Sequence, residues 1–252
     1  MTGALLYAFD SEIKYTKIAV ECAKRINHYL GIPVSLVTDQ PTNETVFESV
    51  IVVDKLPTKN YRYWQDTDTT TEWYNSGRSG ALDITPYDRT LLVDIDYMIN
   101  SSVLSNLLES SQGFFAHKTV MPIKKHVTTE TFGLHKTPMW WATVVVFDHS
   151  EFSRDVFRMW QMVESNYQHY ANVFGFDARK FRNDYALSIA LLVANGNTVP
   201  EQCNIPWPLV NVDPDLAVTL DVGKWSINEE FYTRNQDLHI LGKSYLENVY
   251  AL

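Results

Sequence analysis

The stretch Pro86–Ile99, with the sequence PYDRTLLVDIDYMI, decides how the rest of the chain is interpreted. Within it, the apolar run Thr90–Val93 predicts a buried strand. Asp94 and Asp96 follow this run two positions apart, so a continued strand would place both carboxylates on one face. Two like charges placed so closely repel each other unless a cation binds between them. The stretch therefore predicts a site for a hard divalent cation, Mn²⁺ or Mg²⁺, at the end of a buried strand.

The segments that precede this stretch follow the pattern of a parallel sheet. Apolar runs predict strands at Ala4–Phe9, Pro33–Thr38 and Ser49–Val53. Between the first two, Tyr15–Leu30 has apolar residues near the 3.6-residue period and predicts a helix, which Gly31 is suited to end. This alternation of strand, helix and strand favours a parallel sheet with right-handed crossovers.

The remainder of the chain continues as an α/β protein. The expected elements are a long loop at Thr58–Thr71, a weak helix at Trp73–Asp83, a helix capped by Ser101 or Ser102 and ending at Leu108, strands at Phe114–His117 and Ala142–Phe147, helices at Phe152–Tyr170 and Asp184–Ala194, and short strands in the last fifth. No repeat or linker divides the sequence. We therefore expect a single α/β domain over residues 1–252, with a mixed, mostly parallel central sheet flanked by helices.

Composition and charge narrow the classes of function. The chain has 252 residues, of which 45% are hydrophobic, and a formal net charge of −9. An acidic chain is a poor candidate for strong nonspecific binding to nucleic acid. Two cysteines form neither a disulfide framework nor a zinc cluster. With no signal peptide pattern and no apolar run long enough to span a membrane, we expect a cytoplasmic protein.

Carboxylates also follow the predicted strands near the N-terminus. Asp10 comes after the first strand and Asp39 after the second. Ligands of open α/β sheets bind outside the carboxyl ends of the strands, so both residues are candidates for a binding site. Aspartate is also a good helix cap, and this alternative is equally open for each of them.

The stretch Pro86–Ile99 resembles the motif of GT-A-fold glycosyltransferases, especially those of family 8, which includes glycogenin and bacterial galactosyltransferases. In that family the Asp-x-Asp pair binds Mn²⁺ and the diphosphate of a nucleotide sugar. A basic residue on the preceding helix contacts the donor, and Arg78 has the matching spacing. The segment Leu238–Lys243, LHILGK, is similar to the family's C-terminal segment, in which a histidine completes the metal shell and a glycine and a lysine lie near the phosphates.

The resemblance implies a GT-A, Rossmann-like fold, with a nucleotide-sugar-binding half at 1–120 and an acceptor half at 121–252 that ends in the metal-ligand segment. It implies Mn²⁺ or Mg²⁺ as cofactor and a nucleotide sugar, expected to be a UDP-sugar, as donor. The implied site residues are Asp94, Asp96 and His239 for the metal, Asp10, Ser11 and Tyr15 for the uracil, Arg78, Gly242 and Lys243 for the diphosphate, and Asp184 with Arg78 for catalysis. The sequence also resembles glycosyltransferase-like proteins of tailed phages, which would act in the host cytoplasm.

Structural roles remain open for three of these residues: His239 as a buried structural histidine, Asp184 as the start of a helix, and Arg78 as an exposed helix charge. The expected function is sugar transfer with retention to an unknown acceptor, which could be a glycan, a protein, a metabolite or modified nucleic acid. Two alternatives are a non-catalytic nucleotide-sugar-binding protein and a phosphotransferase that uses the Asp-x-Asp pair. The second ranks lower, because such enzymes usually carry the pair after their first strand.

Overall fold

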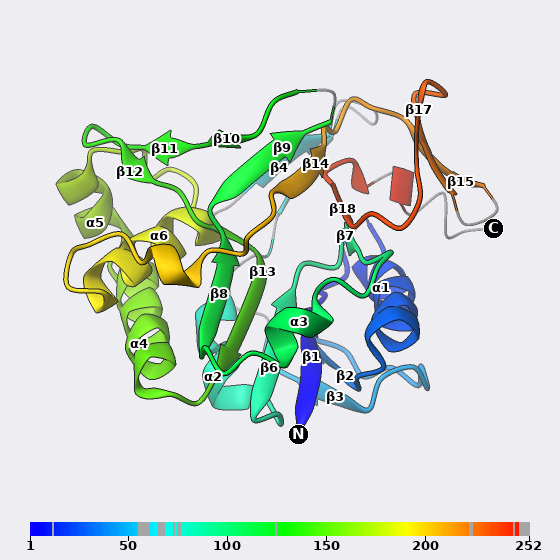
Figure 1. Ribbon diagram of the computed structural model, residues 1–252, viewed down its shortest axis with the longest axis horizontal. Coiled ribbons are helices and arrows are strands. Elements are labelled where there is room, and N and C mark those ends of the chain that lie inside the picture. The colour runs from blue at the N-terminus through cyan, green and yellow to red at the C-terminus, as the bar shows by residue number, and fades with distance from the viewer. Residues whose placement is uncertain are drawn as a thin grey trace.

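The computed structural model of the chain describes residues 1–11, 13–54, 61–64, 69–72, 74, 77–123, 125–221, 224–243 and 245–246. Figure 1 shows the arrangement of its elements. The helices are α1 (Tyr15–Leu30), η1 (Arg78–Gly80, a 3₁₀ turn), α2 (Ala81–Ile84), α3 (Ser105–Leu108), α4 (Glu151–Ser165), α5 (Tyr167–Phe174), α6 (Asn183–Ala194) and η2 (Glu201–Cys203, a 3₁₀ turn). The strands are β1 (Thr2–Tyr7), β2 (Val34–Thr38), β3 (Ser49–Val52), β4 (Tyr61–Trp64), β5 (Thr69–Glu72), β6 (Arg89–Val93), β7 (Tyr97–Met98), β8 (Phe114–His117), β9 (Thr119–Pro122), β10 (Thr128–Thr129), β11 (Thr131–Phe132), β12 (Thr137–Pro138), β13 (Trp141–Asp148), β14 (Leu209–Val212), β15 (Val218–Asp221), β16 (Lys224–Ile227), β17 (Phe231–Thr233) and β18 (Leu238–Ile240).

A six-stranded mixed sheet forms the centre of the molecule, in the order β3-β2-β1-β6-β13-β8. The first four strands are parallel, and β13 runs antiparallel to both β6 and β8. Helix α1 lies on one side of this sheet in Figure 1, and α4, α5 and α6 lie on the other. The predicted α/β class, with a mixed and mostly parallel sheet flanked by helices, is confirmed. Because β1 and β6 are parallel neighbours, the residues that follow them lie at the same edge of the sheet.

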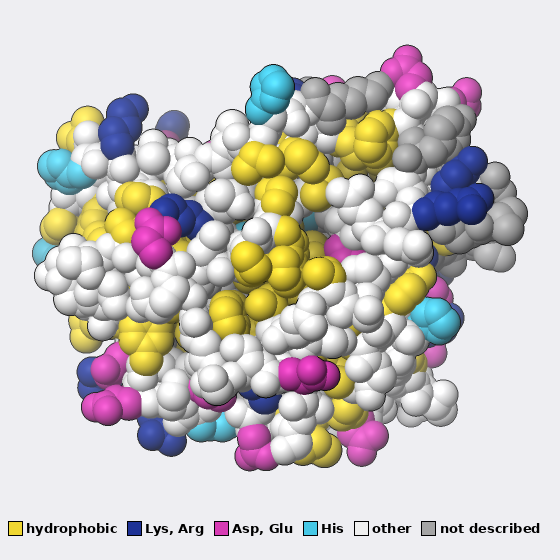
Figure 2. All heavy atoms as spheres, in the orientation of Figure 1, with side chains coloured by type: hydrophobic (Ala, Val, Ile, Leu, Met, Phe, Trp, Pro, Cys, Tyr) yellow, Lys and Arg dark blue, Asp and Glu magenta, His cyan; other side chains and the backbone are white. Residues whose placement is uncertain are grey.

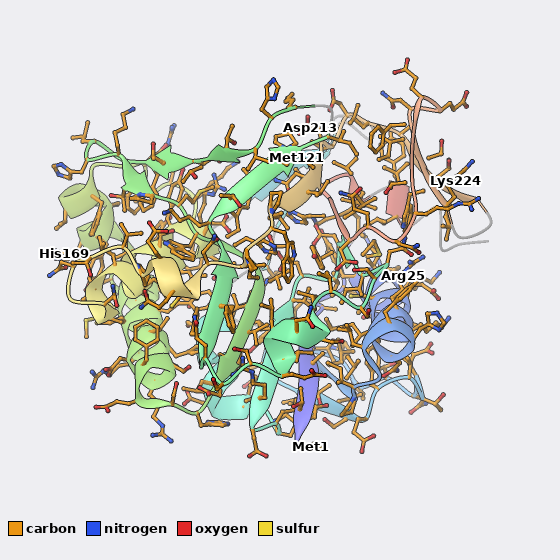
Figure 3. All side chains as sticks on the ribbon, viewed as in Figure 1. Met1, Arg25, Met121, His169, Asp213 and Lys224 are labelled. Carbon is orange, nitrogen blue, oxygen red and sulfur yellow. The ribbon has the colours of Figure 1, made fainter. Side chains whose placement is uncertain are left out.

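Helix α1 has the predicted bounds, Tyr15–Leu30. Its buried residues are Ile18, Ala19, Cys22, Ala23 and Ile26, which face the sheet at helical spacing. Gly31 ends the helix with a φ of 65°, in the left-handed region that favours glycine, and its amide donates to the carbonyl of Asn27 at 3.1 Å. Arg25 extends from the same helix (Figure 3), and its guanidinium carbon lies 5.1 Å from the centroid of the Trp225 ring.

The single helix predicted at Phe152–Tyr170 is wrong, because the chain turns at Asn166 and continues as a separate helix, α5. Asn166 has φ −121° and ψ 33°, outside helical geometry, and its side-chain amide donates to the carbonyl of Met162 at 2.9 Å. Such a local side-chain bond offers the backbone an alternative to helix continuation. The turn brings Tyr167 against the ring of Phe181, with ring centroids 4.8 Å apart.

Four further predictions need correction. The loop expected at Thr58–Thr71 contains most of an antiparallel hairpin of β4 and β5, and residues 58–60 and 65–68 lie outside the described part of the chain. The helix expected at Trp73–Asp83 is reduced to η1 and α2, and residues 73, 75 and 76 are likewise not described. The helix ending at Leu108 begins only at Ser105, so neither serine is at its N-cap position, which Leu104 occupies. The Ser101 hydroxyl donates to Asp237 at 3.0 Å. The first strand also begins two residues earlier than expected.

A second sheet, in the order β10-β9-β14-β18-β7, brings the C-terminal segment to the centre of the molecule. Strand β18 runs antiparallel to β7, with His239 opposite Tyr97, and parallel to β14, with His239 beside Asn211. Because β7 directly follows the Asp94–Asp96 turn, this pairing places His239 next to the two carboxylates. Side chains between Ala4 and Leu246 contribute to one continuous hydrophobic core.

The surface carries mixed charges. On the face shown in Figure 2, hydrophobic side chains gather over the middle, and acidic and basic side chains lie scattered around the periphery. Among the helices of the described residues, none combines the length and the apolar character that crossing a membrane requires.

Candidate metal centre

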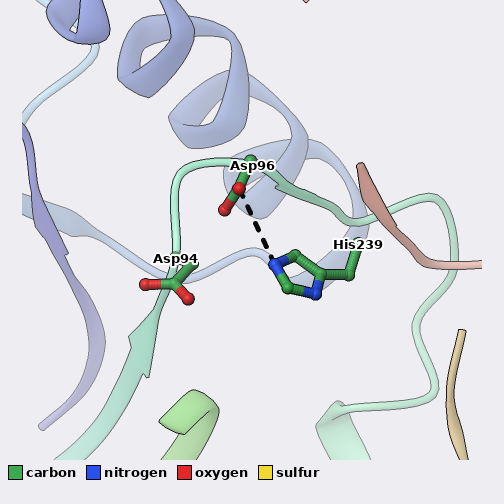
Figure 4. Close-up of side chains that lie close together, drawn as sticks. All are labelled: Asp94, Asp96 and His239. Carbon is green, nitrogen blue, oxygen red and sulfur yellow. Dashed lines mark ion pairs between the residues drawn. The ribbon is translucent and has the colours of Figure 1, made fainter. Parts of the chain in front are cut away.

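Asp94, Asp96 and His239 lie together beyond the end of β6 (Figure 4). Each offers one possible ligand atom, and these atoms all lie within 4.8 Å of one another. Asp96 and His239 are buried, whereas the side chain of Asp94 is 34% exposed. The cluster therefore has two covered ligands and one that is open to solvent.

A turn brings the two carboxylates together, not the continued strand that the sequence predicts. Strand β6 ends at Val93, and Asp94–Asp96 lies in a turn in which the amide of Tyr97 donates to the carbonyl of Asp94 at 3.0 Å. The main chain on both sides fixes this turn. The amide of Asp94 donates to the carbonyl of Thr143 at 2.8 Å, and the amide of Ile240 donates to the carbonyl of Asp96 at 2.9 Å.

His239 is oriented by a neighbour in the adjacent strand. Its Nδ1 lies 2.9 Å from Oδ1 of Asn211, and its Nε2 lies 3.6 Å from Oδ2 of Asp96. With the Asn211 oxygen as acceptor, Nδ1 is the donor and Nε2 is the ring nitrogen that faces Asp96. Histidine ligands of metals are commonly fixed in this way by a hydrogen bond to the other ring nitrogen.

Each carboxylate of the cluster also has a basic partner. Arg78 forms an ion pair with Asp94, and Lys243 forms one with Asp96. Burial by itself would raise the pKa of Asp96, but Lys243 and His239 outweigh it and hold this pKa well below its usual range. Burial lowers the pKa of Arg78 to about 10, so its guanidinium stays charged at neutral pH. The alternative of Arg78 as an exposed helix charge is wrong, since the residue is 6% exposed.

Arg78 also connects the cluster to Asp184. Its Nη2 donates to the carbonyl of Ala142 at 2.7 Å, and the amide of Ala142 donates to Oδ1 of Asp184 at 3.0 Å. The pairing of β13 with β8 shifts register between Trp141 and Val145, which makes the Ala142 amide accessible to α6. Asp184 therefore lies in the first turn of α6, as the structural alternative expects, and also within reach of the predicted site.

Arg182 is the second partner of Asp184. Its Nη2 donates to Oδ2 of Asp184 at 3.1 Å, and its guanidinium carbon lies 4.7 Å from the centroid of the Tyr185 ring. Burial would lower the pKa of Arg182, but Asp184 raises it above its usual value. Both oxygens of Asp184 thus accept hydrogen bonds from the protein.

The residues predicted to bind the uracil lie where β1 leads into α1. Oδ1 of Asp10 accepts hydrogen bonds from the amide of Thr16 at 2.8 Å and from its hydroxyl at 2.9 Å. Asp10 thus caps the first turn of α1, as the structural alternative expects. Ser11 lies in the bend before the helix and Tyr15 is its first residue. The structure brings none of the three into the cluster of Asp94, Asp96 and His239, and their contact with a base stays a prediction.

Gly242 lies where the chain approaches two neighbours closely. A Cβ at this position would lie 2.9 Å from the Tyr245 ring and 3.1 Å from the carbonyl oxygen of Pro214. Packing therefore gives Gly242 a structural reason to lack a side chain, and it positions the chain just before Lys243.

Two neighbours of the metal centre escape the sequence analysis. The sequence marks Asn211 only weakly, as a polar residue within the buried strand Leu209–Val212.

Nothing in the sequence marks His117 as a neighbour of the site. It is fully buried at the end of β8, and neither ring nitrogen has a hydrogen-bond partner among the described residues. Burial, and then the nearby His239, lower the pKa of His117 to about 3. The contact of Asn211 with His239 could not be predicted either, because it depends on the pairing of β14 with β18, which are distant in sequence.

Comparison with known proteins gives matches among solved structures alone. No protein-family profile matches the chain, and no curated protein matches it. The chain is similar to the galactosyltransferase LgtC, with 14% identity and a TM-score of 0.45 over 76% of this chain and 70% of that one. It is similar to the glycosyltransferase GlyE of Streptococcus pneumoniae TIGR4, with 9% identity and a TM-score of 0.45 over 75% of this chain, and it spans 43% of that protein. It is also similar to mouse xyloside xylosyltransferase 1, with 12% identity and a TM-score of 0.45 over 88% of this chain and 89% of that one.

Proposed function

We propose that this chain is a metal-dependent glycosyltransferase, which moves a sugar from a nucleoside diphosphate donor, a UDP-sugar, to an acceptor. One observation carries the proposal: Asp94, Asp96 and His239 converge at the carboxyl edge of the parallel strands, and the cations Arg78 and Lys243 contact the same cluster. Ligands of open α/β sheets bind at this edge.

The donor atoms of the cluster suit Mn²⁺ or Mg²⁺. Two carboxylates and one imidazole are the oxygen-rich set that these cations accept, while structural zinc prefers closed shells of thiolate and imidazole. The hydrogen bond between His239 and Asn211 supports this fit, because it leaves Nε2 as the ligand atom. When bound, such a metal would act as a Lewis acid that neutralises the charge on a departing diphosphate.

Arg78 and Lys243 would add their positive charge to that of the metal. Arg78 and Lys243 are both buried, and a diphosphate is the kind of ligand whose developing negative charge two such cations stabilise. Lys243 now pairs with Asp96, so a cation that binds Asp96 competes with Lys243 for the same oxygen. Gly242 keeps the chain beside this lysine free of side-chain bulk.

We assign Asp184 and Arg78 to the catalytic step and Asp10, Ser11 and Tyr15 to the uracil. Asp184 and Arg78 hydrogen-bond to the backbone amide and carbonyl of the same residue, Ala142, which supports a joint role near the sugar. A carboxylate near an oxocarbenium-like transition state stabilises its positive charge. Transfer with retention, and the division into a donor half at 1–120 and an acceptor half at 121–252, belong to the same proposal.

Calorimetric titration tests this function directly. UDP, GDP and their sugars are titrated into the protein with Mn²⁺, with Mg²⁺ and with neither, and release of sugar from the donor that binds is then measured. We expect UDP to bind only with a metal and Asp94→Asn to lose that binding. Asp213→Asn is the matched control, because Asp213 pairs with Lys125 outside the cluster. If no nucleotide binds with either metal, the proposal is wrong; binding without sugar release favours a non-catalytic nucleotide-sugar-binding protein.

A further inference from the structure

Glu164 lies in the last turn of α4 and contacts the turn that carries Arg78. Its Oε1 accepts a hydrogen bond from the amide of Gly77 at 3.1 Å, and its Oε2 accepts one from the hydroxyl of Ser79 at 2.5 Å. Gly77 and Ser79 are the two neighbours of Arg78 in the sequence. One carboxylate thus contacts the chain on both sides of Arg78.

Other contacts fix the same turn from two directions. On the sheet side, the Tyr7 hydroxyl donates to the carbonyl of Gly77 at 3.3 Å, and the φ of Gly77 is +87°, which favours glycine. On the helix side, Gln161 lies one turn before Glu164 and donates to Asp83 at 2.8 Å. Helix α4 therefore contacts the segment η1–α2 at two positions of one face.

The direction of the Arg78 side chain depends on where this turn lies. Its guanidinium donates to the Ala142 carbonyl at 2.7 Å and pairs with Asp94, in surroundings that leave it 6% exposed. A hydrogen bond of this length is lost when its partners separate by about 1 Å. A displaced turn would therefore remove Arg78 from both partners at once.

We infer that Glu164 is a positioning residue that fixes the Gly77–Ser79 turn and so directs Arg78 towards Asp94 and Ala142. Glu164 does not itself belong to the cluster. The inference rests on the proposed function only where it assigns Arg78 to the donor site; the contact between Glu164 and the turn is independent of that assignment.

The test compares two variants of Glu164 with a control on the same helix. Glu164→Leu removes both hydrogen bonds, whereas the amide of Glu164→Gln can accept from the Gly77 amide and donate to the Ser79 hydroxyl. Asp155→Leu is the matched control, because Asp155 pairs with Arg158 on the exposed side of α4. The first readout is the ¹H–¹⁵N signal of the Arg78 Nε, assigned through Arg78→Lys. The second is the affinity for UDP with Mn²⁺.

We expect Glu164→Leu to shift the Arg78 signal and to weaken UDP binding about tenfold, which corresponds to the loss of one or two hydrogen bonds. Glu164→Gln and Asp155→Leu should leave both readouts near their wild-type values. An unchanged Arg78 signal in Glu164→Leu would overturn the inference, as would an effect of Glu164→Gln as large as that of Glu164→Leu.

A milder variant covers the case in which Glu164→Leu does not fold. Ser79→Ala removes only the hydroxyl contact and should shift the same signal by a smaller amount; no shift would contradict the inference. If the wild-type protein binds no UDP, the proposed function fails, while the Arg78 signal still reports whether Glu164 positions this side chain.

Discussion

Arg78 and Asp184 both hydrogen-bond to the backbone of one residue, Ala142. Arg78 donates to its carbonyl at 2.7 Å, and its amide donates to Asp184 at 3.0 Å. The two side chains come from η1 and α6, which are far apart in the sequence, and both elements pack against α4. The residues that we assign to catalysis thus contact the backbone of one residue and lie on elements that pack against one helix.

Replacement of Asp94 and replacement of Asp96 should lower the free energy of unfolding by different amounts. Asp94→Asn and Asp96→Asn should each abolish Mn²⁺ binding. Asp96→Asn should also lower the free energy of unfolding by several kcal/mol, because it leaves Lys243 buried without its carboxylate; removing one partner of a buried pair costs about 3–5 kcal/mol. Asp94→Asn should cost less, because Asp94 is more exposed and Arg78 keeps its hydrogen bond to the Ala142 carbonyl. Metal titration and urea unfolding measure the two effects, and Mn²⁺ binding by either variant would remove that residue from the metal site.

Removal of Lys243 should strengthen metal binding in the absence of nucleotide. Lys243 pairs with Asp96, so the cation must displace it, and Lys243→Met relieves that competition while keeping most of the apolar part of the side chain. We expect Mn²⁺ to bind Lys243→Met more tightly than the wild type, and UDP to bind it less tightly. Lys125→Met is the control, since Lys125 pairs with Asp213 on the surface. Equal or weaker Mn²⁺ binding by Lys243→Met would show that the lysine does not compete.

Asp10 offers a test of a structural role against a binding role. Asp10→Ala removes the acceptor for the amide and hydroxyl of Thr16, and loss of such a cap costs about 1 kcal/mol. We therefore expect a lower midpoint in urea unfolding. UDP titration of the same variant decides the second role: weaker binding supports contact with the uracil, whereas unchanged binding leaves Asp10 with the helix alone.

His117 should make the stability of the fold depend on pH. Its pKa is about 3 in the folded state, against about 6.5 when unfolded, so between these values the unfolded chain binds a proton that the folded one does not. Stability is therefore lost as pH falls below about 6.5, at up to about 1.4 kcal/mol per pH unit. His117→Leu should remove this part of the slope between pH 6 and pH 4. An identical slope in both proteins would mean that folding does not lower the pKa of His117.

Local signals were sufficient for those parts of the fold whose residues interact nearby in the sequence. Helix α1 was predicted with its observed bounds because its apolar spacing and Gly31 are both local features. The break at Asn166 was missed although its hydrogen bond to Met162 is local, because the apolar spacing continues past it into α5, and the contact of Tyr167 with Phe181 lies beyond the helix itself. The hairpin of β4 and β5 was missed because its residues have little apolar alternation.

The residues of the candidate site likewise fall into those that a sequence motif marks and those that only the fold brings together. The convergence of Asp94, Asp96 and His239 follows from motifs that can be read in the sequence, and the pairing of β18 with β7 provides its physical basis. The ion pairs made by Arg78 and Lys243, and the contact of Glu164 with the Gly77–Ser79 turn, depend on side chains that meet only after the sheets have formed. No local pattern marks Glu164 among the acidic residues of α4.

The pairing of β18 with β7 also determines when the site can form. Asp94 and Asp96 leave the ribosome well before His239 and Lys243, which lie on or just after β18. Until that strand is added, the nascent chain has the two carboxylates without the imidazole and without the lysine that pairs with Asp96. The metal centre can therefore form only after β18 has been synthesised and has paired with β7.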